Sequence, residues 1–187
     1  MSPLCSEERR ALLNRARRAI TEAVHGDRPA QSPYRFDPHA PREVTPGLFV
    51  TLHYRGHLRG CVGQIESVEP LAEVVERCAV SAARDDPRFS PVSSDELSDL
   101  EIEISLLSPL EPIVEDAIEI GHHGLVVERG SRRGLLLPQV ASERHWQQQR
   151  FVEETCVKAG LPRDAWKEPA TRMFAFTTEI FSDASCH

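Results

Sequence analysis

The 187 residues carry a formal net charge of −7 at pH 7, with 40% hydrophobic and 27% charged side chains. This composition is typical of one ordinary globular domain and not of a disordered chain. An acidic chain without a long basic run is a poor match for nucleic acid, whose phosphates attract lysine and arginine. We therefore expect no nucleic-acid partner.

The sequence predicts neither a secretory signal nor a membrane span, because no apolar run approaches the roughly 20 residues that a spanning helix needs. The five cysteines are widely spaced and form no C-x-x-C pair: Cys5, Cys61, Cys78, Cys156 and Cys186. Such spacing is typical of reduced thiols and not of a disulfide framework or a zinc site. We therefore expect a cytoplasmic protein without a metal ion or a cofactor.

The first predicted element is an amphipathic helix that begins at an N-cap, Ser6, and ends at Gly26. Five arginines lie in this helix: Arg9, Arg10, Arg15, Arg17 and Arg18. We interpret them as its solvated face, and an anion-binding patch is the alternative. From Asp27 to Pro46, five prolines indicate an irregular, extended connection.

A hairpin is predicted next, with strands over residues 48–54 and 57–61 joined by a two-residue turn. In that register His53 and His57 point to opposite faces of the hairpin. His57 and Cys61 would share a face but lie about 13 Å apart, at about 3.3 Å per residue. Since zinc ligands lie within about 2.3 Å of the metal, we reject a shared metal site.

The second strand of the hairpin carries the most unusual stretch of the chain, Leu58-Arg59-Gly60-Cys61-Val62-Gly63. Glycine is used where the backbone takes a positive φ or approaches another group, so Gly60 and Gly63 indicate a bent, uncovered backbone. A thiol held there would face a cleft, where Arg59 and free backbone N–H groups bind an anion and activate the thiol. The alternative is that Cys61 is a small apolar residue in a bulged strand.

A second helix is predicted from Pro70 to about Ala82, with Cys78 on its apolar stripe. It ends at Asp85-Asp86-Pro87, where aspartate side chains are expected to stabilise a turn. Arg88, in the loop that follows, is a candidate anion-binding residue, because a loop arginine is free to point into a cleft.

Residues 101–107 alternate cleanly and predict a strand with three inward residues, Ile102, Ile104 and Leu106. Glu101 and Glu103 resemble a carboxylate pair for acid–base catalysis. We interpret them, with Ser105, as solubilising residues on the wet face of a sheet, where alternate polar positions are ordinary.

Two adjacent histidines, His122 and His123, precede a second predicted hairpin with strands over residues 125–128 and 134–137. His123, beside a glycine, is a candidate base or hydrogen-bond donor. Stabilisation of the turn is the alternative interpretation.

The C-terminal part predicts a third helix over residues 146–159, with Cys156 on its buried face, and a short helix anchored by Trp166. A final long strand is expected over residues 171–181. The tail over residues 183–187 is expected to fray.

Several separated stretches together resemble the AMMECR domain family, in an order and spacing that fit from about Leu12 to Phe181. They are Leu58-Arg59-Gly60-Cys61-Val62-Gly63, Asp86-Pro87-Arg88-Phe89-Ser90-Pro91, the strand from Leu100 to Pro109, His123-Gly124-Leu125, Leu137-Pro138-Gln139-Val140 and Glu154-Thr155-Cys156-Val157-Lys158-Ala159-Gly160-Leu161-Pro162. The later stretches resemble the prokaryotic branch, AmmeMemoRadiSam system protein A. Genes of that type are associated with a Memo-like protein and a radical SAM protein.

The resemblance implies an α+β fold of two unequal lobes, with a mixed or antiparallel sheet and about three main helices. It implies a single AMMECR-type domain over residues 6–182, with the cysteine motif in a cleft between the lobes. It supplies no reaction. Gln64 stands where the family usually has a small residue, and we expect it to narrow the entrance of the cleft.

Two functions follow from these patterns. In the first, the cleft binds a small anionic ligand or substrate, with Cys61 as nucleophile or covalent anchor and His123 as base or proton donor. Four residues of the same motifs would bind the ligand: Arg59, Gly60, Gly63 and Arg88. In the second, the chain is a non-catalytic binding module for a Memo-like or radical SAM partner, and the glycine motif is a contact surface or a fold element.

Overall fold

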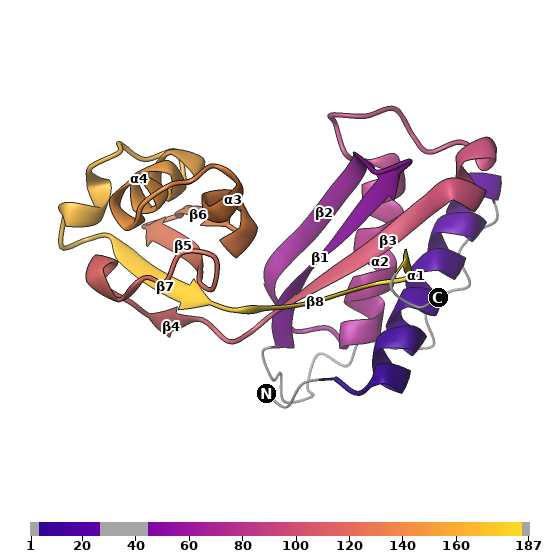
Figure 1. Ribbon diagram of the computed structural model, residues 1–187, viewed down its shortest axis with the longest axis horizontal. Coiled ribbons are helices and arrows are strands. Elements are labelled where there is room, and N and C mark those ends of the chain that lie inside the picture. Colours follow the sequence, from indigo (N-terminus) through magenta and orange to yellow (C-terminus); the bar gives the residue numbers. More distant parts are fainter. Residues whose placement is uncertain (1–3, 27–44, 185–187) are drawn as a thin grey trace. The chain divides into compact units, whose positions relative to one another are not determined.

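The computed structural model describes residues 4–26 and 45–184, and the predicted connection over 27–44 lies outside the described residues. The chain folds into two compact units (Figure 1). Unit 1 comprises the described residues up to Leu106 and from Glu179 onward, and unit 2 comprises Leu107–Thr178. Both units combine helices with an antiparallel sheet, which confirms the α+β class. We expected one sheet, whereas the structure has two separate four-stranded sheets, one in each unit.

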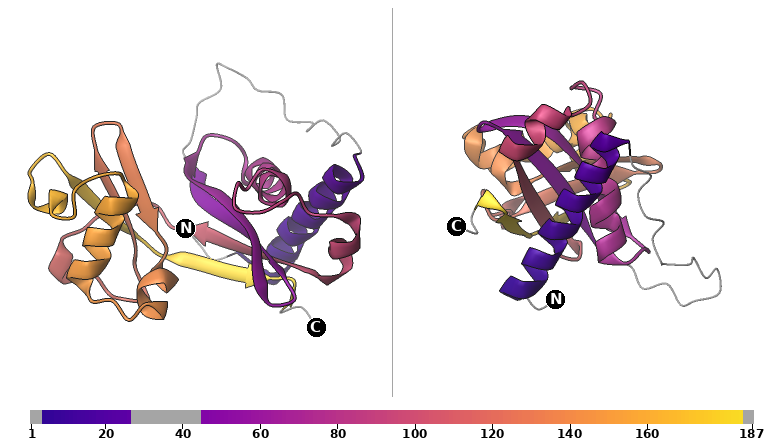
Figure 2. Two further views of the ribbon diagram at one scale, coloured as in Figure 1. Left: turned by 90° about the horizontal axis from the view of Figure 1, so that it is seen from above. Right: turned by 90° about the vertical axis from the view of Figure 1, so that its right-hand side faces the viewer.

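Unit 1 contains a four-stranded sheet with strand order β2-β1-β3-β8. Its elements are α1 (Ser6–His25), β1 (Thr45–Tyr54), β2 (His57–Ser67), α2 (Leu71–Arg84), the 3-10 helix η1 (Ser94–Asp99), β3 (Leu100–Leu107) and β8 (Thr178–Ser182). Figures 1 and 2 show α1 and α2 side by side over one face of this sheet. The core lies between these helices and alternate residues of β1 and β3, which are Leu48, Val50, Leu52, Ile102, Ile104 and Leu106.

The arginines of α1 tie the helix to other elements and are not merely a solvated face. In the described part of the chain, four of the five form ion pairs, and each of these four reaches a residue outside the helix. Their partners are Glu179 for Arg9, Glu76 for Arg15, Asp183 for Arg17, and both Glu76 and the helix's own Glu22 for Arg18. The N-cap is Cys5, one residue earlier than expected, and it forms a capping box with Glu8.

The last described residues are held in place. Asp183 donates its backbone N–H to the carbonyl of Ile102 at 3.1 Å, and its carboxylate accepts the N–H of Ile102 at 2.9 Å. The first residue of the tail that we expected to fray is thus fixed to β3, whereas residues 185–187 lie outside the described part of the chain.

Unit 2 is a second sheet with strand order β4-β7-β5-β6 and its own core. Its elements are β4 (Glu111–Pro112), η2 (Glu115–Ala117), β5 (Gly124–Arg129), β6 (Arg132–Leu136), α3 (Pro138–Glu143), α4 (Gln148–Lys158), η3 (Ala165–Lys167) and β7 (Arg172–Phe176). The predicted hairpin, third helix and short Trp166 helix are confirmed, with boundaries shifted by a few residues. The sequence did not predict α3, which begins at Pro138.

The expected long strand over residues 171–181 is wrong. It is two strands, β7 and β8, which belong to different sheets. At Thr177 the chain bonds instead to the segment that enters unit 2: its N–H donates to the Ser108 hydroxyl, and its carbonyl accepts the Ser108 N–H. The interruption is therefore where the chain changes sheets.

No helix in the described part of the chain is long and apolar enough to cross a membrane. Of the cysteines, Cys78 and Cys156 are buried in the cores of units 1 and 2, as predicted from their helix stripes. Burial raises the pKa of both thiols. Cys5 is exposed and Cys61 is half-buried.

Replacement of each cysteine by serine separates core thiols from the motif thiol. Cys78→Ser and Cys156→Ser should each lower the free energy of unfolding by roughly 1–3 kcal/mol, because a buried hydroxyl needs a partner. Cys61→Ser should cost less than about 1 kcal/mol, because this side chain is only half-buried. Thermal melts of the three variants measure this order. If Cys61→Ser is the most destabilised, Cys61 is a core residue.

Candidate functional site

The hairpin of β1 and β2 has the predicted turn but contains a bulge that changes the faces of the motif. His53 pairs with Leu58, whereas Leu52 pairs with Gly60, so Arg59 is an extra residue on β2. An extra residue shifts the alternation of side chains by one position. The expectation that His57 and Cys61 share a face is therefore wrong. Among the described residues, no three histidine, cysteine or acidic side chains form a group that could hold a metal ion.

The two glycines of the motif allow close packing and are not bent, uncovered backbone as we expected. Neither has a positive φ. A Cβ on Gly60 would lie 2.1 Å from the carbonyl oxygen of Ala82 in α2, and one on Gly63 would lie 2.3 Å from that of Leu48. Any larger residue would push these elements apart. The glycines thus act as fold elements, and Gly60 is buried beneath α2.

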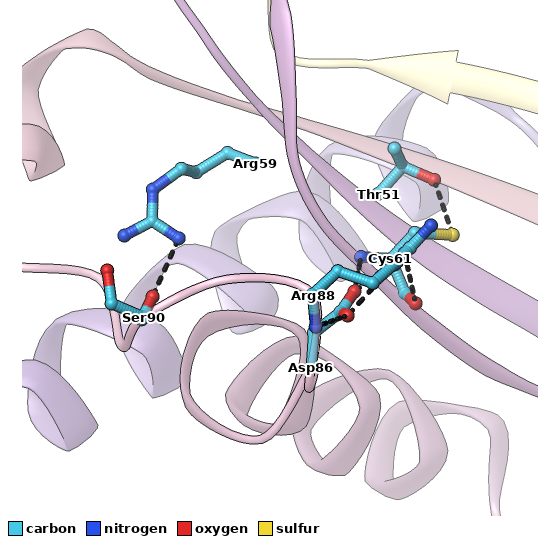
Figure 3. Close-up of polar contacts among 6 residues, drawn as sticks. All are labelled: Thr51, Arg59, Cys61, Asp86, Arg88 and Ser90. Atoms are coloured by element: carbon cyan, nitrogen blue, oxygen red, sulfur yellow. Dashed lines mark hydrogen bonds and ion pairs between the residues drawn. The ribbon is translucent and has the colours of Figure 1, made fainter.

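A buried carboxylate, Asp86, organises the site (Figure 3). It is only 4% exposed. Its Oδ2 accepts the backbone N–H of Cys61 at 2.9 Å and the Nη2 of Arg88 at 2.7 Å, and its Oδ1 accepts Nε of Arg88 at 2.9 Å. These donors, the Arg88 guanidinium first, hold the pKa of Asp86 well below its usual range. The predicted aspartate-stabilised turn is confirmed, and it also binds the edge strand β2.

The Arg59 guanidinium makes its hydrogen bonds within the protein. The bulge directs it toward the loop after α2, where Nε and Nη2 donate to the Glu96 carboxylate at 2.7 and 3.0 Å. Nη1 donates to the carbonyl of Ser90 at 2.8 Å, and Nη2 also reaches that of Pro91 at 3.2 Å. The side chain is 13% exposed. Arg59 therefore holds the loop against β2, and its guanidinium is not available for the anion-binding role that we expected.

Arg88 is the motif arginine that remains accessible, with its side chain 53% exposed. Its Nη2 lies 3.4 Å from the carbonyl oxygen of Cys61. The Asp86 carboxylate raises the pKa of Arg88, and the Cys61 thiol adds a smaller contribution. The guanidinium thus lies beside Cys61, where Asp86 fixes it through Nε and Nη2.

Cys61 points to the face of the sheet opposite α1 and α2. It pairs in register with Thr51 on β1, whose hydroxyl donates to Sγ at 3.3 Å (Figure 3). The sequence pattern did not indicate Thr51, because its contact with Cys61 depends on the bulged register. The correct hairpin register would have found it, since paired residues in an antiparallel ladder have neighbouring side chains.

His123 stabilises a turn in unit 2. Its Nδ1 accepts the N–H of Glu119 at 3.0 Å, and its own N–H donates to the Glu119 carbonyl at 2.9 Å. This geometry supports the turn-stabilising interpretation and leaves the ring proton on Nε2. The other candidate site residues belong to unit 1 instead: Arg59, Gly60, Cys61, Gly63 and Arg88. A role of His123 as a base for the thiol stays a prediction.

Two further expectations about side chains near the motif change. Gln64 pairs with Leu48 on the core face of the sheet, and its Oε1 accepts Nη2 of Arg77 at 2.8 Å. It therefore points to the face opposite Cys61 and narrows no entrance beside it. On β3, Glu101 is exposed and Glu103 half-buried, but Ser105 is buried, so the outer face is only partly wet.

The Arg59–Glu96 pair predicts an acid-labile contribution to stability. Arg59, with the Ser93 N–H, lowers the pKa of Glu96 from 4.5 to about 2. A lowered folded-state pKa stabilises the protein above the unfolded-state pKa, and this stabilisation is lost as the pH falls through the folded-state value. Glu96→Gln should therefore cost roughly 1–3 kcal/mol at pH 7, and the difference from wild type should shrink between pH 4.5 and pH 2.

Urea unfolding at pH 7, 4 and 3 measures this difference. Asp95→Asn, an exposed position on the same 3-10 helix, is the matched control and should change stability little at any pH. If the difference in the free energy of unfolding between Glu96→Gln and wild type stays constant with pH, the charge of the carboxylate contributes nothing to stability.

Known proteins resemble this chain over nearly its whole length. A protein of Methanothermobacter thermautotrophicus is 43% identical over 97% of both chains. Protein TK0174 of Thermococcus kodakarensis is 41% identical over 92% of this chain and 88% of its own. The crystal structure of the uncharacterised protein PH0010 from Pyrococcus horikoshii matches with a TM-score of 0.79 and 39% identity, over 92% of this chain and 89% of that one.

The family model AMMECR1 matches residues 13–181, which include most of unit 1, all of unit 2, the cysteine motif and the Asp86 loop. This agrees with the family that the separated motifs resemble. The chain therefore belongs to the AMMECR1 family.

Proposed function

We propose that Cys61 is the reactive thiol of a site for a small anionic ligand or substrate, and that Arg88 holds the anion. The observation that carries this proposal is the position of the half-exposed Arg88 guanidinium beside Cys61, 3.4 Å from its carbonyl oxygen and fixed there by buried Asp86. A cysteine thiol is a nucleophile of covalent catalysis. Thr51 donates a hydrogen bond to Sγ of Cys61, and Arg88 lies against the Cys61 backbone.

The contacts of Arg88 leave part of its guanidinium for a ligand. Asp86 binds Nε and Nη2 and does not use Nη1. A planar guanidinium with one edge fixed presents its remaining N–H groups in a defined direction, which suits recognition of a carboxylate or a phosphate. Cys61 then serves as nucleophile or covalent anchor for a ligand whose anionic group lies at Arg88.

Charge-selective alkylation tests this site. Iodoacetate and iodoacetamide attack thiols by the same reaction but differ in charge, and peptide mass spectrometry gives the rate at each cysteine. The iodoacetate-to-iodoacetamide rate ratio should be higher at Cys61 than at exposed Cys5 of the same molecule. Arg88→Gln should lower the ratio at Cys61 by roughly fivefold, the equivalent of about 1 kcal/mol, and leave Cys5 unchanged.

Two further variants control this experiment. Arg88→Lys keeps the charge and should retain part of the preference, whereas Arg77→Gln removes an exposed arginine of α2 and should have no effect. Equal ratios at Cys61 and Cys5 in the wild-type protein would contradict the proposal, independently of any effect of Arg88→Gln on folding.

A second candidate function is a non-catalytic binding module for a Memo-like or radical SAM partner. The observation that favours it is that Arg59, Gly60 and Gly63 make internal contacts, so much of the motif serves the fold. The motif also presents an apolar side chain to solvent, since Leu58 is 42% exposed. Such a side chain at a protein surface is suited to a contact with another protein.

Co-purification with each partner protein at micromolar concentration tests the module. A complex is expected, and Leu58→Asp should weaken it. Ile180→Asp is the matched control, because Ile180 on β8 is equally exposed at 42% but lies outside the motif. Absence of a complex with either partner, or equal effects of both substitutions, would argue against the module.

A further inference from the structure

A row of three side chains crosses the face of the unit 1 sheet opposite the two helices. Thr51 on β1 pairs with Cys61 on β2 and, on its other side, with Glu103 on β3. Residues paired in this way project their side chains from the same face as neighbours. Since the backbones of adjacent strands are about 4.8 Å apart, the Cα atoms of Cys61 and Glu103 lie roughly 10 Å apart, with Thr51 between them.

The row is bounded along the strands. In the next row Phe49 lies opposite Gly63, and its ring covers that glycine, 2.4 Å from where a Cβ would be. In the row on the other side, His53 lies between Leu58 and Glu101. The short Thr51 side chain is thus flanked along β1 by the larger side chains of Phe49 and His53.

The two ends of the row carry opposite charges. Arg88 lies beside Cys61 at one end. Glu103 lies at the other end, half-buried, and forms no ion pair with any residue that the structure describes. A half-buried carboxylate is stabilised by a cation, so an ammonium group would bind favourably there.

We infer that the ligand is a small zwitterion, of the size of an amino acid. Its acidic group lies at Arg88, its ammonium group lies at Glu103, and Thr51 lies beneath it. This inference rests on the proposed function, because it uses the same thiol and the same arginine. It adds Glu103 as the residue that selects a zwitterion over a simple anion.

Thiol–disulfide exchange with three matched disulfides tests the inference. Cystine carries a carboxylate and an ammonium group on each half, 3,3'-dithiodipropionate lacks the ammonium group, and cystamine lacks the carboxylate. The Cys61 thiolate attacks one sulfur, the S–S bond of the reagent breaks, and the released thiolate takes a proton from water. The other half remains on Cys61 as a mixed disulfide, so no further oxidant is needed.

Rates at Cys61 are divided by the rates at Cys5, which removes the intrinsic reactivity of each reagent. The wild-type protein should then prefer cystine over 3,3'-dithiodipropionate. Glu103→Gln should lower this preference by about threefold or more, since it removes one charge contact with little change in shape. Glu101→Gln, on the same face of the same strand but one row away, is the matched control and should leave it unchanged.

The outcomes separate the two proposals. If Arg88→Gln slows both carboxylate reagents relative to cystamine but Glu103→Gln leaves the cystine preference at its wild-type value, the zwitterion inference is overturned and the anion site stands. If Arg88→Gln changes nothing, the proposed function fails, and this inference fails with it. Equal losses in Glu101→Gln and Glu103→Gln would assign the effect to the general charge of the face and would also overturn the inference.

Discussion

The buried carboxylate of Asp86 is the interaction on which the site depends. It accepts hydrogen bonds from the backbone of Cys61 and from the Arg88 guanidinium, and so joins an edge strand to the loop after α2. A buried carboxylate without partners costs several kcal/mol, so these contacts stabilise one another. The same bonds occupy polar groups on the outer edge of β2, where another strand would otherwise pair.

Some residues of the motif serve the fold, and Cys61 belongs to the proposed site. Gly60 lets α2 approach β2, and Arg59 holds the loop by its bonds to Glu96 and to two carbonyl groups. These contacts hold the loop that carries Arg88, but they do not take part in the proposed binding of an anion by Arg88. The β-bulge makes this division possible, because one extra residue points Arg59 toward the loop and Cys61 toward the opposite face.

The proposed site lies on one face of the unit 1 sheet. Strand spacing fixes the separation of side chains in a row, so three residues from three strands form a defined line without a loop of their own. In this protein the line carries a thiol, a hydroxyl and a carboxylate, and the guanidinium of Arg88 joins it from the loop at the edge. The core packed on the other face of the sheet supports the strands that carry this proposed site.

The sequence by itself determined the elements whose signals are local: the apolar periodicity of α1, α2 and α4, the alternation of β3, and the burial of Cys78 and Cys156. It also identified the family and the motif stretches that contain Cys61 and Arg88. Only the tertiary structure decided which arginine is accessible, which residues share a face with the thiol, and where the chain changes sheets after β7. These features depend on partners far apart in sequence, such as Cys61 with Asp86 at a separation of 25 residues and Arg59 with Glu96 at 37. Periodicity reports only on near neighbours, so a one-residue bulge and the contacts that it redirects leave no trace in it.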